Sequence, residues 1–123
     1  MMKRDNPVRE KSYSFALRMI RLYKYLTDDK REFLLAKQVL RSGTSIGANV
    51  EEALGGQSKK DFISKLSVAY KEARETEYWL RLLTDSGFLS AKESRSVLTD
   101  CRELLKLLTK ILRTSRTKSV HTE

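Results

Sequence analysis

The sequence predicts an all-α protein with the fold of an antiparallel up-down-up-down four-helix bundle. Apolar residues recur along most of the chain at the three- and four-residue spacing of amphipathic helices. The 123 residues include only one proline and five glycines, which is too few breaks for a sheet protein with many turns. At this length, one domain can enclose a single hydrophobic core.

The first two predicted helices lie in residues 7–54. Asn6 is a suitable N-cap and is followed by proline, which is tolerated at the first helical position, so the first helix is expected over residues 7–27. Asp29 and Glu32 have the spacing of a capping box, which predicts the start of a second helix. That helix is expected to end near residue 54, before a glycine pair.

Two glycines stand inside the second predicted helix. Gly43 and Gly47 each cost about 1 kcal/mol relative to alanine in a helix interior. Their four-residue spacing places them on the same face of the helix. We therefore expect a neighbouring helix to pack closely against them.

The third predicted helix begins after Ser58, continues to Ser86 and is stopped by Gly87. Glu77 falls within its apolar stripe, where an apolar residue would normally stand. A buried carboxylate is costly without a partner, so we expect Glu77 to be paired if it is buried.

The fourth predicted helix opens with a capping box formed by Ser90 and Glu93 and runs to about Arg116. The bundle domain is expected to comprise residues 1–117. Residues 118–123 are expected to form a disordered polar tail.

The residues that carry common enzyme chemistry are scarce. His121 is the only histidine and lies in the predicted tail, so a Ser/His catalytic pair or a histidine metal site is not expected. Cys101 is the only cysteine and falls among apolar residues, as a buried structural cysteine does. We expect a non-enzymatic protein with no catalytic residues, no cofactor and no metal.

The chain has no apolar run that approaches the roughly 18 residues needed to span a membrane. Its first residues also lack the apolar stretch of a secretion signal. A cytoplasmic protein with no membrane partner is therefore expected.

The formal net charge of +9 permits an anionic partner. Six basic residues of the fourth helix project over an arc of about 80° opposite its apolar stripe, and two arginines lie on a flank of the first helix. These candidate nucleic-acid-binding residues are Arg18, Arg21, Lys92, Arg95, Arg102, Lys106, Lys110 and Arg113. If helices 1 and 4 are adjacent, the residues form a continuous strip that could follow a phosphate backbone. A solvated helix face explains the pattern equally well, so both interpretations stay open.

The third predicted helix carries more apolar surface than one core can use. Val68, Trp79 and Leu82 share a second face, which predicts an oligomer interface. On the second helix, Ser45, Asn49 and Glu52 form a polar row. We interpret this row as hydrogen bonding across a helix pair or subunit contact, because it contains no nucleophile with a base.

Several of these residues belong to longer motifs. The motifs are Ser45-Ile46-Gly47-Ala48-Asn49-Val50-Glu51-Glu52-Ala53, Ser58, Lys60-Asp61-Phe62, Leu66, Ala69, Lys71-Glu72-Ala73-Arg74-Glu75-Thr76 and Tyr78-Trp79-Leu80. Their order and separation resemble the four helix bundle proteins encoded in 23S rRNA intervening sequences, over nearly the whole chain. The resemblance implies an up-down-up-down bundle that assembles as a homopentamer. It marks Ser45, Asn49, Glu52 and Glu75 as motif positions without an assigned role.

Members of this family look like the accessory variability determinant proteins of diversity-generating retroelements, which bind nucleic acid and a reverse transcriptase. Our first hypothesis is therefore a non-enzymatic homo-oligomeric bundle that binds nucleic acid, above all RNA, through a basic face of helices 1 and 4. It would act as an accessory to a nucleic-acid-processing partner. The alternative is a structural or adaptor protein that acts through protein–protein contacts and whose charge only keeps it soluble.

Overall fold

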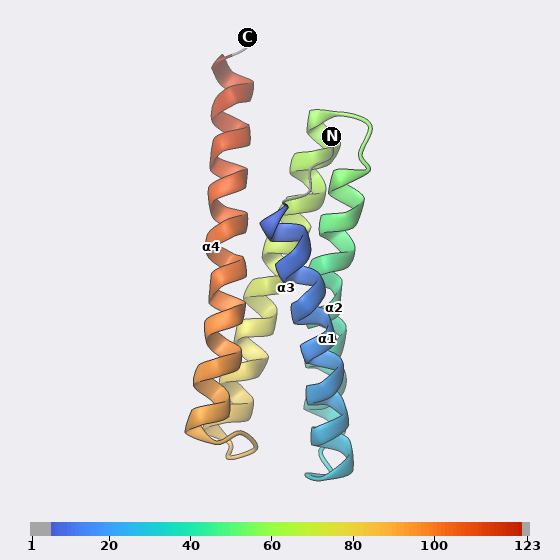
Figure 1. Cartoon of the computed structure of the whole chain (residues 1–123), viewed down its shortest axis with the longest axis vertical. Helices are drawn as coiled ribbons and strands as arrows, with labels where there is room; N and C mark the ends of the chain where they lie inside the picture. The colour runs from blue at the N-terminus through green and yellow to red at the C-terminus, as the bar shows by residue number, and fades with distance from the viewer. Residues whose placement is uncertain (1–5, 122–123) are drawn as a thin grey trace.

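The computed structural model describes the backbone of residues 6–121 and the side chains of residues 6–117. Four helices follow one another along the chain: α1 (Pro7–Asp28), α2 (Leu34–Leu54), α3 (Lys59–Asp85) and α4 (Ala91–His121). Short connections join them, so successive helices run in opposite directions (Figure 1). The described residues contain no β-strand, and the predicted all-α bundle is confirmed.

Three helix starts have the predicted caps. The Asn6 side chain accepts a hydrogen bond from the backbone N–H of Arg9 at 3.2 Å, and Pro7 occupies the first turn of α1. The Ser58 hydroxyl accepts from the backbone N–H of Asp61 at 3.1 Å at the start of α3. Ser90 and Glu93 form the reciprocal bonds of a capping box, at 2.9 and 3.1 Å. Local sequence therefore determines where α1, α3 and α4 begin.

The predicted capping box between α1 and α2 is wrong. Asp29 is the C-cap of α1, and its backbone N–H donates to the Tyr25 carbonyl at 2.9 Å. The chain then reverses through Arg31, whose φ of 56° lies in the left-handed region. Glu32 still serves the start of α2, because its carboxylate accepts from the backbone N–H of Ala36 at 3.0 Å.

The ends of the later helices also bear on the predictions. Gly87 has a φ of 89° directly after the C-cap of α3, as expected for a glycine that stops a helix. α4 continues to His121, beyond the expected end near Arg116. The tail predicted over residues 118–123 lies outside the described side chains, so its disorder stays a prediction.

The helices pack in chain order, α1 on α2, α2 on α3 and α3 on α4, while α4 touches α1 over a shorter stretch. Figure 1 shows α4 beside α3 in the lower half of the bundle and apart from α1 and α2 toward its C-terminus. The apolar faces form one buried core that includes Met19, Ile46, Leu80 and Leu108. Among the described residues, the backbones of the diagonal helices α1 and α3 do not approach each other closely.

The two glycines of α2 face α1 at close range. A Cβ atom on Gly43 would lie 2.4 Å from Cγ of Met19, and one on Gly47 would lie 3.2 Å from the carbonyl oxygen of Ser12. Neither distance leaves room for an ordinary van der Waals contact of about 3.5–4.0 Å. The close helix approach predicted from these glycines is confirmed.

Candidate nucleic-acid interface

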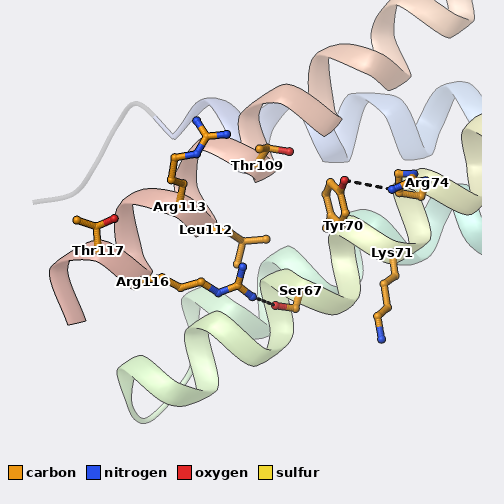
Figure 2. A pocket seen from close by; sticks show the side chains of 9 residues that line it. All are labelled: Ser67, Tyr70, Lys71, Arg74, Thr109, Leu112, Arg113, Arg116 and Thr117. Carbon is orange, nitrogen blue, oxygen red and sulfur yellow. Dashed lines mark hydrogen bonds between the residues drawn. The ribbon is translucent and has the colours of Figure 1, made fainter. Parts of the chain in front are cut away.

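An open groove follows the seam between α3 and α4. It consists of two hollows of about 810 and 720 Å³ that share the lining residues Tyr70, Arg74, Thr109 and Arg113. We call their union the α3–α4 groove. Its α3 wall is set by the face of that helix next to Tyr70, and its α4 wall by the second half of the longest helix (Figure 2).

Cations dominate the lining of the α3–α4 groove. They are Lys71, Arg74, Lys106, Lys110, Arg113 and Arg116. Among the described residues, none of these six forms an ion pair. The single acid in the lining, Glu77, is paired with Arg102, whose Nε lies 2.7 Å from Glu77 Oε2. The groove therefore presents uncompensated positive charge. Glu77 is partly buried, and it has the ion-pair partner that we expected for it.

The floor of the groove is partly apolar. Leu112 is buried beneath the cations, and the half-buried Tyr70 packs against the core. Arg74 donates to the Tyr70 hydroxyl at 3.3 Å, and its guanidinium lies 5.9 Å from the centre of the ring. On the opposite wall, Arg116 reaches across the seam and donates to the Ser67 hydroxyl at 3.1 Å (Figure 2). Arg74 and Arg116 are thus held in place by other residues of the groove.

The seam between α1 and α4 has a different character. Arg18 donates to Asp100 at 2.7 Å and also to the hydroxyl of Ser96 at 2.8 Å, and Lys11 lies 3.5 Å from Glu103. The hollow along this seam is lined by three cations and three acids: Lys11, Arg18, Arg21, Glu10, Asp100 and Glu103. Its charges balance, so it offers no net attraction to a phosphate.

The described structure does not bring the basic residues of α1 and α4 into one hollow, and the strip predicted across helices 1 and 4 stays a prediction. The hollows that Arg18 and Arg21 line contain acids of α4 and none of its basic residues. The basic arc of α4 instead turns toward α3, where Arg102 meets Glu77 and three other members line the groove. Lys92 and Arg95 are exposed in the first turns of α4, away from the groove. Nucleic-acid binding by the individual residues stays a prediction.

The polar row of α2 divides into two parts. Ser45 donates to the Ser42 carbonyl at 3.0 Å and Asn49 to the Ser45 carbonyl at 2.9 Å, so both bond within their own helix. Only Glu52 reaches a neighbour, with Oε1 lying 3.0 Å from Nζ of Lys65 on α3.

The fourth motif residue, Glu75, pairs with Arg41 of α2 and accepts from the Trp79 indole N–H at 3.0 Å. Glu52 and Glu75 thus join α2 to α3, and neither lies in the α3–α4 groove.

Exposed apolar side chains form a patch on each of two helices, α1 and α3, that lie diagonally across the bundle; Leu34 and Leu54 of α2 are exposed as well. On α3, Val68 is exposed, whereas Trp79 and Leu82 are half-buried, and Tyr78 packs edge-on against Trp79. The sequence analysis missed a second patch on α1. It consists of Tyr13, Leu17 and Ile20, which are 63, 41 and 40% exposed and share the helix face away from the core.

Cys101 behaves as a structural residue. It is fully buried, and its thiol donates to the Ala73 carbonyl at 3.5 Å. Burial raises the pKa of this thiol to about 12, with a further increase from the nearby carboxylate of Glu77. Such a thiol is protonated at neutral pH and is a poor nucleophile.

In the part of the chain that the structure describes, no three His, Cys, Asp or Glu side chains are grouped in a way that could hold a metal ion. We also find no helix among these residues that has the length and hydropathy of a membrane span.

Sequence reasoning missed four residues of the groove, namely Tyr70, Lys71, Arg74 and Arg116. The available signal was the placement of Lys71 and Arg74 three residues apart, on the side of α3 away from its polar contacts with α2. This pattern predicts a basic groove only once α4 is known to pack against the same side of α3.

Comparisons with known proteins bear on the whole chain. Residues 4–110 match the family described as 23S rRNA-intervening sequence protein. A crystal structure at 1.70 Å resolution of a protein of unknown function from the S23 ribosomal protein family of Bacteroides thetaiotaomicron VPI-5482 is similar, with a TM-score of 0.87 and 49% sequence identity. The similarity covers 90% of this chain and 99% of that chain. The comparison with curated proteins found no match.

Proposed function

The chain belongs to the 23S rRNA-intervening sequence protein family, and from that premise we propose that it is a non-enzymatic homo-oligomer that binds RNA through the α3–α4 groove. The observation that carries this proposal is the set of six cations in the groove with no ion-pair partner among the described residues. Like charges held this close repel one another, and a polyanion relieves that repulsion.

The groove suits the RNA backbone better than it suits any one base sequence. Lysine and arginine side chains neutralise phosphates, and their positions carry no sequence information by themselves. The lining contains no asparagine or glutamine that could pair with a base edge. We therefore propose that the groove contacts the RNA backbone and recognises the shape of the RNA, and that it does not read the base sequence.

Salt dependence of RNA binding tests this proposal. If each of the six cations neutralises one phosphate, log K should fall with log salt with a slope of about −4 to −5. The triple variant Lys106→Gln, Lys110→Gln, Arg113→Gln should reduce the slope to about half that value. Fluorescence anisotropy with a labelled structured RNA at several salt concentrations measures both slopes.

A matched control removes the same charge elsewhere. Lys24, Lys30 and Lys37 are exposed outside the groove, and none forms a described ion pair. Their replacement by glutamine should leave the slope close to that of the parent. An equal loss in the control would show that net charge alone attracts RNA, and the groove would be the wrong surface.

The homo-oligomer is supported by the two apolar patches. A ring with rotational symmetry uses two different surfaces on each subunit, one facing each neighbour. The patch on α1 (Tyr13, Leu17, Ile20) and the patch on α3 (Val68, Trp79, Leu82) lie on diagonal helices and thus on opposite sides of the bundle. This arrangement suits a ring, and the proposed number of five subunits comes from the family resemblance alone.

Light scattering with a variant of each patch tests assembly. Leu17→Glu places a charge in the patch on α1, and Trp79→Ala removes the largest side chain of the patch on α3, so each should yield a smaller particle. Ala48→Glu, an exposed position on α2 outside both patches, should leave the particle unchanged. A monomeric parent protein would end this part of the proposal.

The second candidate function is a structural or adaptor role, which the same exposed apolar residues favour. Absence of any RNA binding at low salt, together with intact assembly, would select it. For the first candidate function, the partner class that we propose is a nucleic-acid-processing protein.

A further inference from the structure

The α3–α4 groove contains a feature that phosphate binding alone does not require. Tyr70 lines both hollows, so its ring lies in the middle of the groove, between cations of α3 and of α4. Leu112 continues the apolar floor next to it (Figure 2). Cations at the walls and an aromatic ring at the floor match the two parts of a nucleotide, its phosphate and its base.

An aromatic ring inside the groove favours unpaired RNA over a duplex. In a duplex the flat faces of the bases are covered by their neighbours, and only edges and backbone are accessible. An unpaired base exposes its flat face, which can stack on an aromatic side chain or on an arginine guanidinium. Tyr70 lines both hollows and is half-buried, so a base that stacks on it has to enter the groove, which a base paired within a duplex does not do.

Arg74 is positioned beside the Tyr70 ring and fixed to it. Its guanidinium lies 5.9 Å from the ring centre and donates to the Tyr70 hydroxyl at 3.3 Å, so ring and cation are held together. Arg116 is held on the opposite wall by its bond to Ser67. A pre-ordered ring and cations lose less conformational entropy when a ligand binds.

We propose that the α3–α4 groove binds a single-stranded segment of RNA, with one unpaired base stacked on Tyr70 and the flanking phosphates held by Arg74, Arg113 and Arg116. This inference rests on the proposed function and names its ligand class. The same RNA with every base paired would contact only the cations of the walls.

The experiment compares an unstructured single-stranded RNA of about 15 nucleotides with a duplex of the same length, by fluorescence anisotropy at fixed salt. The parent protein should bind the single strand more tightly. Tyr70→Leu should weaken single-strand binding by about 5- to 150-fold, the range for loss of one base stacked on an aromatic side chain, and should leave duplex binding unchanged. Tyr70→Phe should retain the preference of the parent, because the ring remains.

Tyr25→Leu is the matched control. Tyr25 is also half-buried and also has a cation 5.9 Å from its ring centre, Nζ of Lys30, but it lies outside the groove. Its replacement should leave the single-strand preference intact. Circular dichroism verifies that each variant is folded.

Equal affinity of the parent protein for single strand and duplex would overturn the inference without any variant, and so would equal losses on both RNAs in Tyr70→Leu. Both results leave RNA binding by the groove in place. A parent protein that binds neither RNA at low salt would instead refute the proposed function itself.

Discussion

The close contact between Gly43 of α2 and Met19 of α1 allows a quantitative test of the packing. In Gly43→Ala, the new methyl group would lie 2.4 Å from Cγ, 2.7 Å from Sδ and 3.3 Å from Cβ of Met19. Met19 is fully buried, so any shift of its side chain takes place inside the packed core. Overpacking of a core costs about 1–3 kcal/mol. Alanine in place of glycine recovers about 1 kcal/mol of helix propensity. The free energy of unfolding should therefore fall by about 0–2 kcal/mol.

A double-mutant cycle separates these two terms. Met19→Ala alone should cost about 2–5 kcal/mol because it leaves a cavity. When it is combined with Gly43→Ala, the clash disappears and the methyl group fills part of that cavity. The two changes should therefore couple by about 1–3 kcal/mol in the stabilising direction.

Urea denaturation followed by far-UV circular dichroism, at one protein concentration, measures all four corners of the cycle. Ala48→Gly, at an exposed position of the same helix, gives the propensity term by itself and should cost about 1 kcal/mol. If Gly43→Ala is more stable than the parent by that same amount, or if the cycle is additive, the contact with Met19 is not tight and the argument fails.

Two further predictions concern buried polar groups. The Thr76 hydroxyl donates to the Glu72 carbonyl at 2.7 Å and so accepts the hydrogen bond that joins it to the Ser42 hydroxyl at 2.8 Å in the core. Thr76→Val should therefore cost about 1–3 kcal/mol, because it leaves the Ser42 hydroxyl without this partner. Adding Ser42→Ala should recover part of that loss in urea denaturation, and full additivity would contradict the prediction. The pKa of Cys101 is raised to about 12 in the folded chain, whereas an unfolded thiol titrates near about 8.5. The folded state thus retains a proton that the unfolded state releases. The stability of the parent relative to Cys101→Ala should therefore fall by about 1 kcal/mol between about pH 9 and 10, and a constant difference would refute the assignment.

The helix starts were predictable where the N-cap hydrogen bond joins residues that are close in sequence. Asn6, Ser58 and Ser90 each bond to a backbone N–H three residues ahead, so a few adjacent residues contain all the information. The turn between α1 and α2 was not predictable in the same way. Asp29 and Glu32 have the spacing of a cap, but α1 continues through Asp28 and the reversal at Arg31 depends on tertiary packing.

The position of the α3–α4 groove, the proposed binding surface, could not be predicted from the spacing of apolar residues. Apolar spacing shows which side of α4 faces the core, but it does not show which flank faces α1 and which faces α3. An up-down bundle can turn in either direction with the same apolar stripes. The contacts that reveal the direction are pairs such as Arg102 with Glu77 and Arg18 with Asp100. Partly exposed pairs of this kind contribute only about 0–1 kcal/mol each and have no sequence signature.

The direction in which the bundle turns also explains why the cations of the α3–α4 groove are left without ion-pair partners. All the described acids that pair with cations between α1 and α4 lie on the α1 flank of α4, at Asp100 and Glu103. The opposite flank keeps its cations and meets α3 at a single acid, Glu77, which Arg102 already neutralises. α4 is the longest helix, and its contacts with α3 continue as far as Arg116. The unpaired charge is therefore concentrated where the second half of α4 leans on α3, and an RNA bound there would contact both walls at once.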